Sequence, residues 1–140
     1  MLAEYYCSIW AIWFLISLII VQGFIATLAH RKQSQSIPGI LDGQLGHQSF
    51  VFRSHRTHQN SLENVIQLLA PAALAIFVGV NSTLLATLLW TYAIARLLHM
   101  ALYYAIATDK NPSPRTYFYL IGYLANLTLV GAVAHQLTTL

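Results

Sequence analysis

Long apolar stretches constrain this chain more than any other feature of its sequence. The first runs from Tyr5 to Ala29 without a charged residue, and the stretch from Leu84 to Ala107 contains one charge, that of Arg96. About 20 mostly apolar residues are enough for a helix to cross a bilayer. The composition agrees, since only 8% of the residues are charged, whereas a soluble domain carries about 25%. The sequence therefore predicts an integral membrane protein.

Turn-forming residues divide the chain into four helices. Pro38-Gly39 lies in the one long polar connection, Val80-Asn81-Ser82 forms a short reversal, and residues 109–114 contain two prolines. We expect one transmembrane domain over residues 1–140, with helices at about 3–31, 50–79, 82–108 and 114–136. The fold class is all-α, an integral membrane four-helix bundle. Asn81 or Ser82 is expected to cap the third helix.

The second helix begins with a stripe of polar side chains. At about 100° per residue, six of them fall within an arc of roughly 100°. They are Arg53, Arg56, Asn60, Glu63, Asn64 and Gln67. The apolar residues that follow carry this helix into the membrane, so the stripe lies near a membrane boundary and faces a polar partner.

The third helix contains a second polar line. Tyr92, Arg96, His99 and Tyr103 are spaced by four, three and four residues, which places them on one helix face. A charge near the middle of a membrane helix costs about 2.5–3.5 kcal/mol, so Arg96 needs a partner. Glu63 is the partner we expect. Arg115, Tyr119 and Asn126 form a similar line on the fourth helix.

The basic residues orient the bundle. Six of the seven lie at or beside the connections after the first and third helices. By the positive-inside rule that end is cytoplasmic, and both termini lie on the opposite side of the membrane.

Each polar line also has a simpler interpretation. Arg53, Arg56 and Arg115 can reach lipid headgroups, the amides can join helices at about 0.6 kcal/mol each, and the tyrosines can form an interfacial belt. Two arginines, a glutamate and three amides on one face nevertheless exceed what headgroup contact requires. Arginine pairs with carboxylates and a glutamate accepts from an ammonium group, so a pocket for an anionic or zwitterionic ligand is indicated.

Three segments resemble the MAPEG family, the membrane-associated proteins in eicosanoid and glutathione metabolism. The run Arg53-x-x-Arg56-Thr57-His58-x-Asn60-x-x-Glu63-Asn64 is similar to that family's helix-two signature. Arg96-x-x-His99-x-x-x-Tyr103 resembles its helix-three segment, and Pro114-Arg115-Thr116-x-x-Tyr119 resembles the start of its helix four. Arg31, with Asp42 eleven residues later, resembles the end of helix one and the loop that follows.

The resemblance implies a homotrimer with glutathione, the co-substrate, bound between subunits near the cytoplasmic face. By matching position, the residues that hold its backbone are Arg56, Asn60, Glu63, His99 and Tyr103, and Tyr119 belongs to the same set. Arg31 and Arg53 would support its carboxylates, and Arg115 would face its sulfur. A guanidinium beside a thiol favours the nucleophilic thiolate. The second substrate would be a lipophilic electrophile or hydroperoxide arriving from membrane lipid, and neither a metal nor nucleic acid is expected.

Some residues depart from the family pattern. Gln59 stands where the prostaglandin-forming branch has a basic residue, and Asn64 stands where leukotriene-forming members have a tyrosine. These differences favour a detoxifying glutathione transferase or peroxidase over an eicosanoid enzyme. Two alternatives stay open, a non-catalytic lipid- or thiol-binding protein of the same fold and a small transporter or channel. Polar residues thin out beyond Gln67 and Tyr92, which places the channel last.

Overall fold

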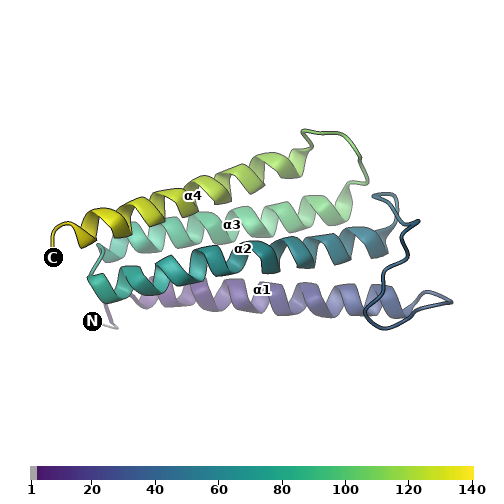
Figure 1. Ribbon diagram of the computed structural model, residues 1–140, viewed down its shortest axis with the longest axis horizontal. Helices are drawn as coiled ribbons and strands as arrows, with labels where there is room; N and C mark the ends of the chain where they lie inside the picture. The colour runs from purple at the N-terminus through teal and green to yellow at the C-terminus, as the bar shows by residue number, and fades with distance from the viewer. Residues whose placement is uncertain (1–2) are drawn as a thin grey trace.

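The computed structural model describes residues 3–140, and four antiparallel helices account for most of them (Figure 1). The helices are α1 (Tyr6–Arg31), α2 (Phe50–Val78), α3 (Ser82–Ala105) and α4 (Pro114–Leu137). Each is long and apolar enough to cross a membrane. The number of helices, their length and their apolar composition confirm the prediction of an all-helical, multi-pass membrane protein.

The helices pack as a bundle in which α1 and α4 lie at opposite corners. α2 and α3 each contact both outer helices, whereas α1 and α4, both fully described, make no contact with each other. Leucines and alanines alternate in the core, with Leu15, Leu68, Leu85, Leu89 and Leu129 fully buried. Small residues let neighbouring helices approach closely, which is how membrane helices associate. Large apolar side chains such as Phe77 and Trp13 point outward, as expected for lipid contact.

The two ends of the bundle are built differently. At the end that holds both termini, Gly79 closes α2 with a φ of 79°, a conformation that suits glycine. The side chain of Asn81 then accepts from Leu84 N at 3.0 Å, which confirms the expected cap of α3. Tyr5 Oη donates to Val80 O at 2.7 Å and fixes the start of α1 against this turn.

The other end carries the two longer connections, residues 32–49 and 106–113 (Figure 1). The third helix ends at Ala105, earlier than the expected boundary near Thr108, because Ile106 adopts an extended conformation. Thr108 Oγ1 instead accepts from Lys110 N at 3.1 Å within the connection. The first helix begins at Tyr6 rather than near residue 3.

Candidate functional site

The polar stripe of α2 divides into buried and accessible side chains. Arg53 is buried, whereas the side chains of Arg56 and Glu63 are 43% and 56% exposed. Arg56 Nη1 and Glu63 Oε1 lie 3.9 Å apart, a loose and accessible pair that contributes little to stability. Both charged groups are therefore available to a ligand that approaches this face.

Arg96 does not pair with Glu63, so the expected partner was wrong. Its Nη2 donates to Asn60 Oδ1 at 2.7 Å and to Ser61 Oγ at 3.0 Å. Arg96 and Ser61 are buried between α2 and α3, while Glu63 points away from them towards the surface. The four residues predicted on one face of α3, including Arg96, are all buried. Arg96 thus fixes the orientation of the Asn60 amide.

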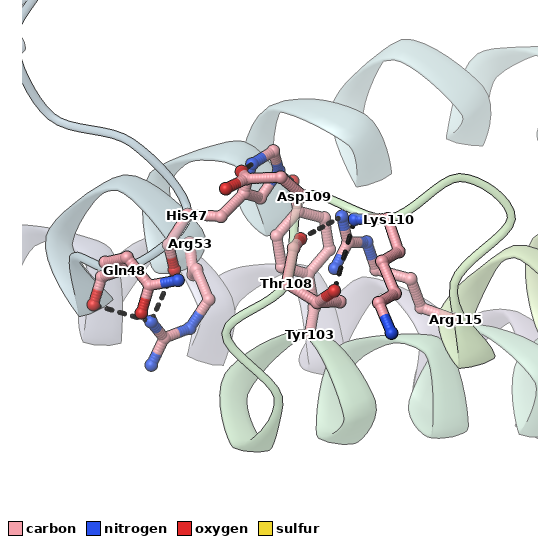
Figure 2. A network of polar contacts seen from close by, with 8 residues as sticks. All are labelled: His47, Gln48, Arg53, Tyr103, Thr108, Asp109, Lys110 and Arg115. Carbon is pink, nitrogen blue, oxygen red and sulfur yellow. Dashed lines mark hydrogen bonds and ion pairs between the residues drawn. The ribbon is translucent and has the colours of Figure 1, made fainter.

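Arg53 is occupied inside the subunit. Its Nη1 donates to the carbonyl oxygens of His47 and Gln48 at 2.7 and 3.0 Å, and its Nη2 donates to Tyr104 O at 3.3 Å. Figure 2 shows the two bonds to the connection before α2, and the bond to Tyr104 joins this connection to the end of α3. A guanidinium committed to three carbonyls is poorly placed to support a ligand carboxylate. Arg53 therefore acts within the subunit, and its predicted contact with a ligand carboxylate stays a prediction.

Residues from α3 and α4 meet around the ring of Tyr103. The guanidinium carbon of Arg115 lies 4.0 Å from the ring centroid, a cation–π contact, and Arg115 Nη2 donates to Thr108 O at 3.5 Å. The ring of His99 lies 5.7 Å from Tyr103 and 6.4 Å from Tyr119. His99 is buried, and its Nδ1 has no hydrogen-bond partner within residues 3–140. His99, Tyr103, Arg115 and Tyr119 thus form one cluster, and their role in binding a ligand stays a prediction.

Arg31 lies elsewhere, on a cavity of about 430 Å³. The cavity is enclosed by the end of α1, the connection after it and the start of α2, and its lining includes His30, His55 and His58. Arg115 and Tyr103 do not line it. Within one subunit, Arg31 is therefore not brought into the α3–α4 cluster.

Two residues of this region were missed by sequence reasoning. His47 Nδ1 is 2.7 Å from Asp109 Oδ1, and His47 Nε2 is 3.1 Å from Tyr103 Oη (Figure 2). Both residues lie in connections, where no periodicity marks a face. Nothing in the sequence predicts that these two connections meet. Across residues 3–140 no three histidine, cysteine or acidic side chains gather as metal ligands.

The sequence profile of the MAPEG family matches residues 6–135, nearly the whole chain. The chain belongs to the MAPEG family. No curated protein and no solved structure matches it. Family membership makes it a membrane protein of the eicosanoid and glutathione group, whose members differ in activity. Within this MAPEG protein, Arg115 of the helix-four segment contacts Tyr103 of the helix-three segment, and Arg96 of the helix-three segment bonds to Asn60 of the helix-two segment.

Proposed function

We propose that this protein is a membrane-bound glutathione-dependent transferase or peroxidase. The observation that carries the proposal is the Arg115 guanidinium, 4.0 Å from the Tyr103 ring centroid, beside the buried His99. A half-buried guanidinium placed among aromatic rings is less screened by water than one in solution. It can therefore stabilise an anion strongly, which is what activation of a thiol requires.

The accessible charges of α2 suit the rest of the ligand. Glutathione is zwitterionic, with two carboxylates and one ammonium group. Arg56 offers a guanidinium to a carboxylate, and Glu63 offers a carboxylate to the ammonium. Asn60, held by Arg96, offers its amide nitrogen to a backbone carbonyl of the tripeptide. His99, Tyr103 and Tyr119 would complete this side of the site.

Arg31 fits the proposal only if a second copy of the chain is present. It lies on α1, which makes no contact with α4, the helix that carries Arg115. In a homotrimer, Arg31 of one subunit would reach the glutathione held by Arg56 and Arg115 of its neighbour. Each site would then be shared between two subunits, as in a closed ring of identical chains.

The proposed reaction is attack by the glutathione thiolate on a lipophilic substrate. With an electrophile, sulfur forms a bond to carbon and the leaving group departs. With a hydroperoxide, sulfur attacks the terminal oxygen, the O–O bond breaks, and the alkoxide takes up a proton and leaves as an alcohol. A second glutathione then attacks the sulfenic acid that has formed, which gives the disulfide and releases water. Such substrates partition into the lipid that the outward apolar faces of the helices contact.

The test is ultraviolet difference spectroscopy of the purified protein in detergent, titrated with glutathione. We expect a saturable thiolate absorbance in the wild type. Arg115→Ala should reduce the thiolate fraction about ten-fold, which corresponds to about 1.4 kcal/mol. Lys110→Ala, which removes an exposed neighbouring cation, should leave the band unchanged. Saturable glutathione binding without a thiolate band in the wild type would instead favour the non-catalytic binding protein.

A further inference from the structure

His47 bridges two groups that sequence and family resemblance leave unconnected. One ring nitrogen contacts the Asp109 carboxylate at 2.7 Å and the other contacts the Tyr103 hydroxyl at 3.1 Å. Its ring also stacks on Tyr103, with centroids 5.9 Å apart and an interplanar angle of 24°. Three side chains from the two connections and α3 thus form one continuous hydrogen-bonded line (Figure 2).

The aspartate determines the direction of the hydrogen bonds in this line. A carboxylate accepts only, so Nδ1 of His47 carries a proton and donates it to Asp109. Nε2 of the neutral ring is then an acceptor, and the Tyr103 hydroxyl donates to it. The oxygen of Tyr103 keeps lone pairs that can accept a proton from a further group, and Arg115 lies on the same ring.

The exposed fraction of the three residues increases along the line from Tyr103 to Asp109. Tyr103 is 8% exposed, the His47 side chain is 25% exposed and the Asp109 side chain is 74% exposed. A proton that enters at Tyr103 therefore reaches the aqueous surface through two residues. The Arg53 guanidinium donates to the backbone carbonyls of His47 and Gln48, and these bonds hold the histidine in this position.

We propose that Tyr103, His47 and Asp109 form a relay that removes the thiol proton of the bound substrate. The inference rests on the proposed function, since it requires a thiol beside Arg115. In the step, the S–H bond breaks and its proton joins the Tyr103 oxygen, while the original phenol proton passes to His47 Nε2. The products are a thiolate next to Arg115 and an imidazolium next to Asp109, which then loses a proton to water.

His47 and Asp109 are positioning residues in this scheme, because they act through Tyr103. Among the residues that the structure describes, three charged or titratable groups face His47: Asp109 from the α3–α4 connection, Tyr103 from α3 and Arg53 from α2. Arg53 donates to the backbone carbonyl of His47. Arg115 of α4 approaches through the Tyr103 ring. Asp109 accepts from His47 Nδ1 and stabilises the imidazolium, although water screens this pair because the carboxylate is exposed.

The experiment is stopped-flow mixing of purified protein with glutathione, following thiolate absorbance and, with a pH indicator, proton release over a range of pH. His47→Gln can still bond both neighbours but cannot carry a proton. We expect thiolate formation to slow about ten-fold or more in this variant, with glutathione affinity unchanged within about two-fold. His135→Gln, at the opposite end of the bundle, is the matched control.

Two further variants separate a relay from a merely structural role. Tyr103→Phe should slow thiolate formation as much as His47→Gln, and the double variant should be no slower than either single variant, because both interrupt one line. Asp109→Asn, on the surface, removes the carboxylate that stabilises the imidazolium, so it should also slow thiolate formation.

Each outcome of this experiment has a defined meaning. A wild-type thiolate band that forms equally fast in His47→Gln overturns the relay and leaves the proposed function intact. Additive slowing in the double variant also overturns the relay. A wild type that binds no glutathione, or forms no thiolate, overturns both the relay and the proposed function.

Discussion

Arg96 shows how a single buried charge organises the candidate site. It is 4% exposed and donates to Asn60 and Ser61, so two polar residues of α2 are held by one residue of α3. Asn60 Oδ1 is thereby occupied, and only its amide nitrogen is left for a ligand. The residue that holds Asn60 is thus as important to the site as Asn60 itself.

Removing either partner should destabilise the protein, but unequally. Arg96→Ala leaves two acceptors without a donor, which costs about 1–3 kcal/mol. Asn60→Ala leaves a buried guanidinium with one acceptor, and we expect a loss of about 3 kcal/mol or more. Unfolding of the ligand-free protein in detergent measures both losses in the free energy of unfolding.

The control is Gln67→Ala, an exposed change on α2, which should alter the free energy of unfolding by less than about 0.5 kcal/mol. A larger loss for Arg96→Ala than for Asn60→Ala would contradict this description.

The sequence was sufficient to predict that Arg96 is buried and needs a polar partner, but not which partner. Helical spacing places Asn60, Ser61 and Glu63 within one turn of α2, and the rotation of α2 against α3 decides among them. That rotation depends on packing along the whole helix. His47 was beyond prediction for a related reason, because its contacts with Tyr103 and Asp109 depend on how two irregular connections fold together.

At the scale of elements, the length of the apolar stretches predicts where the helices lie. The way the helices and connections contact one another depends instead on specific polar side chains. The cap of α3 at Asn81 was predictable because it is local. The end of α3 was not, because Thr108 bonds to Lys110 N and to Arg115, within the connection and across to α4. Arg53 is the clearest case of an element-level contact, since it joins the segment before α2 to the last turn of α3.

Arg53→Ala should therefore loosen two elements together. Three hydrogen bonds from a charged group are lost, and bonds of this kind contribute about 1.5–3 kcal/mol each at most. We expect faster amide hydrogen exchange in residues 44–50 and 102–108, with α1 unchanged. Hydrogen exchange followed by mass spectrometry measures this. Lys110→Ala is the control and should leave both segments protected. Faster exchange throughout all four helices would show that Arg53 supports the whole bundle instead.

At the scale of the whole molecule, the separation of α1 from α4 is the feature that matters most. It divides the proposed ligand residues between two faces of one subunit, with Arg31 on one and Arg115 on the other. The family resemblance implied a shared site, and this division gives a physical reason for one.

Mixed assembly of two inactive variants tests the shared site. At a glutathione concentration that does not saturate the site, Arg31→Ala subunits alone should form little thiolate because binding is weakened, and Arg115→Ala subunits alone should form about ten-fold less. If Arg31 acts on the neighbour's site, random co-assembly of equal amounts restores the intact pair at about one interface in four. Thiolate absorbance per subunit should return to that fraction. No recovery in mixtures shown by mass to contain both variants would mean that both arginines serve the same subunit.

Both chain ends lie at the end of the bundle remote from the His47–Asp109–Tyr103 line (Figure 1). α4 alone has 24 residues, and at 1.5 Å per residue it keeps its two ends about 36 Å apart. A purification tag or fluorophore fused to either terminus therefore stays clear of the relay. On the predicted topology, such a label would also sit across the bilayer from the proposed site, so antibody access in sealed vesicles reports which way the protein faces.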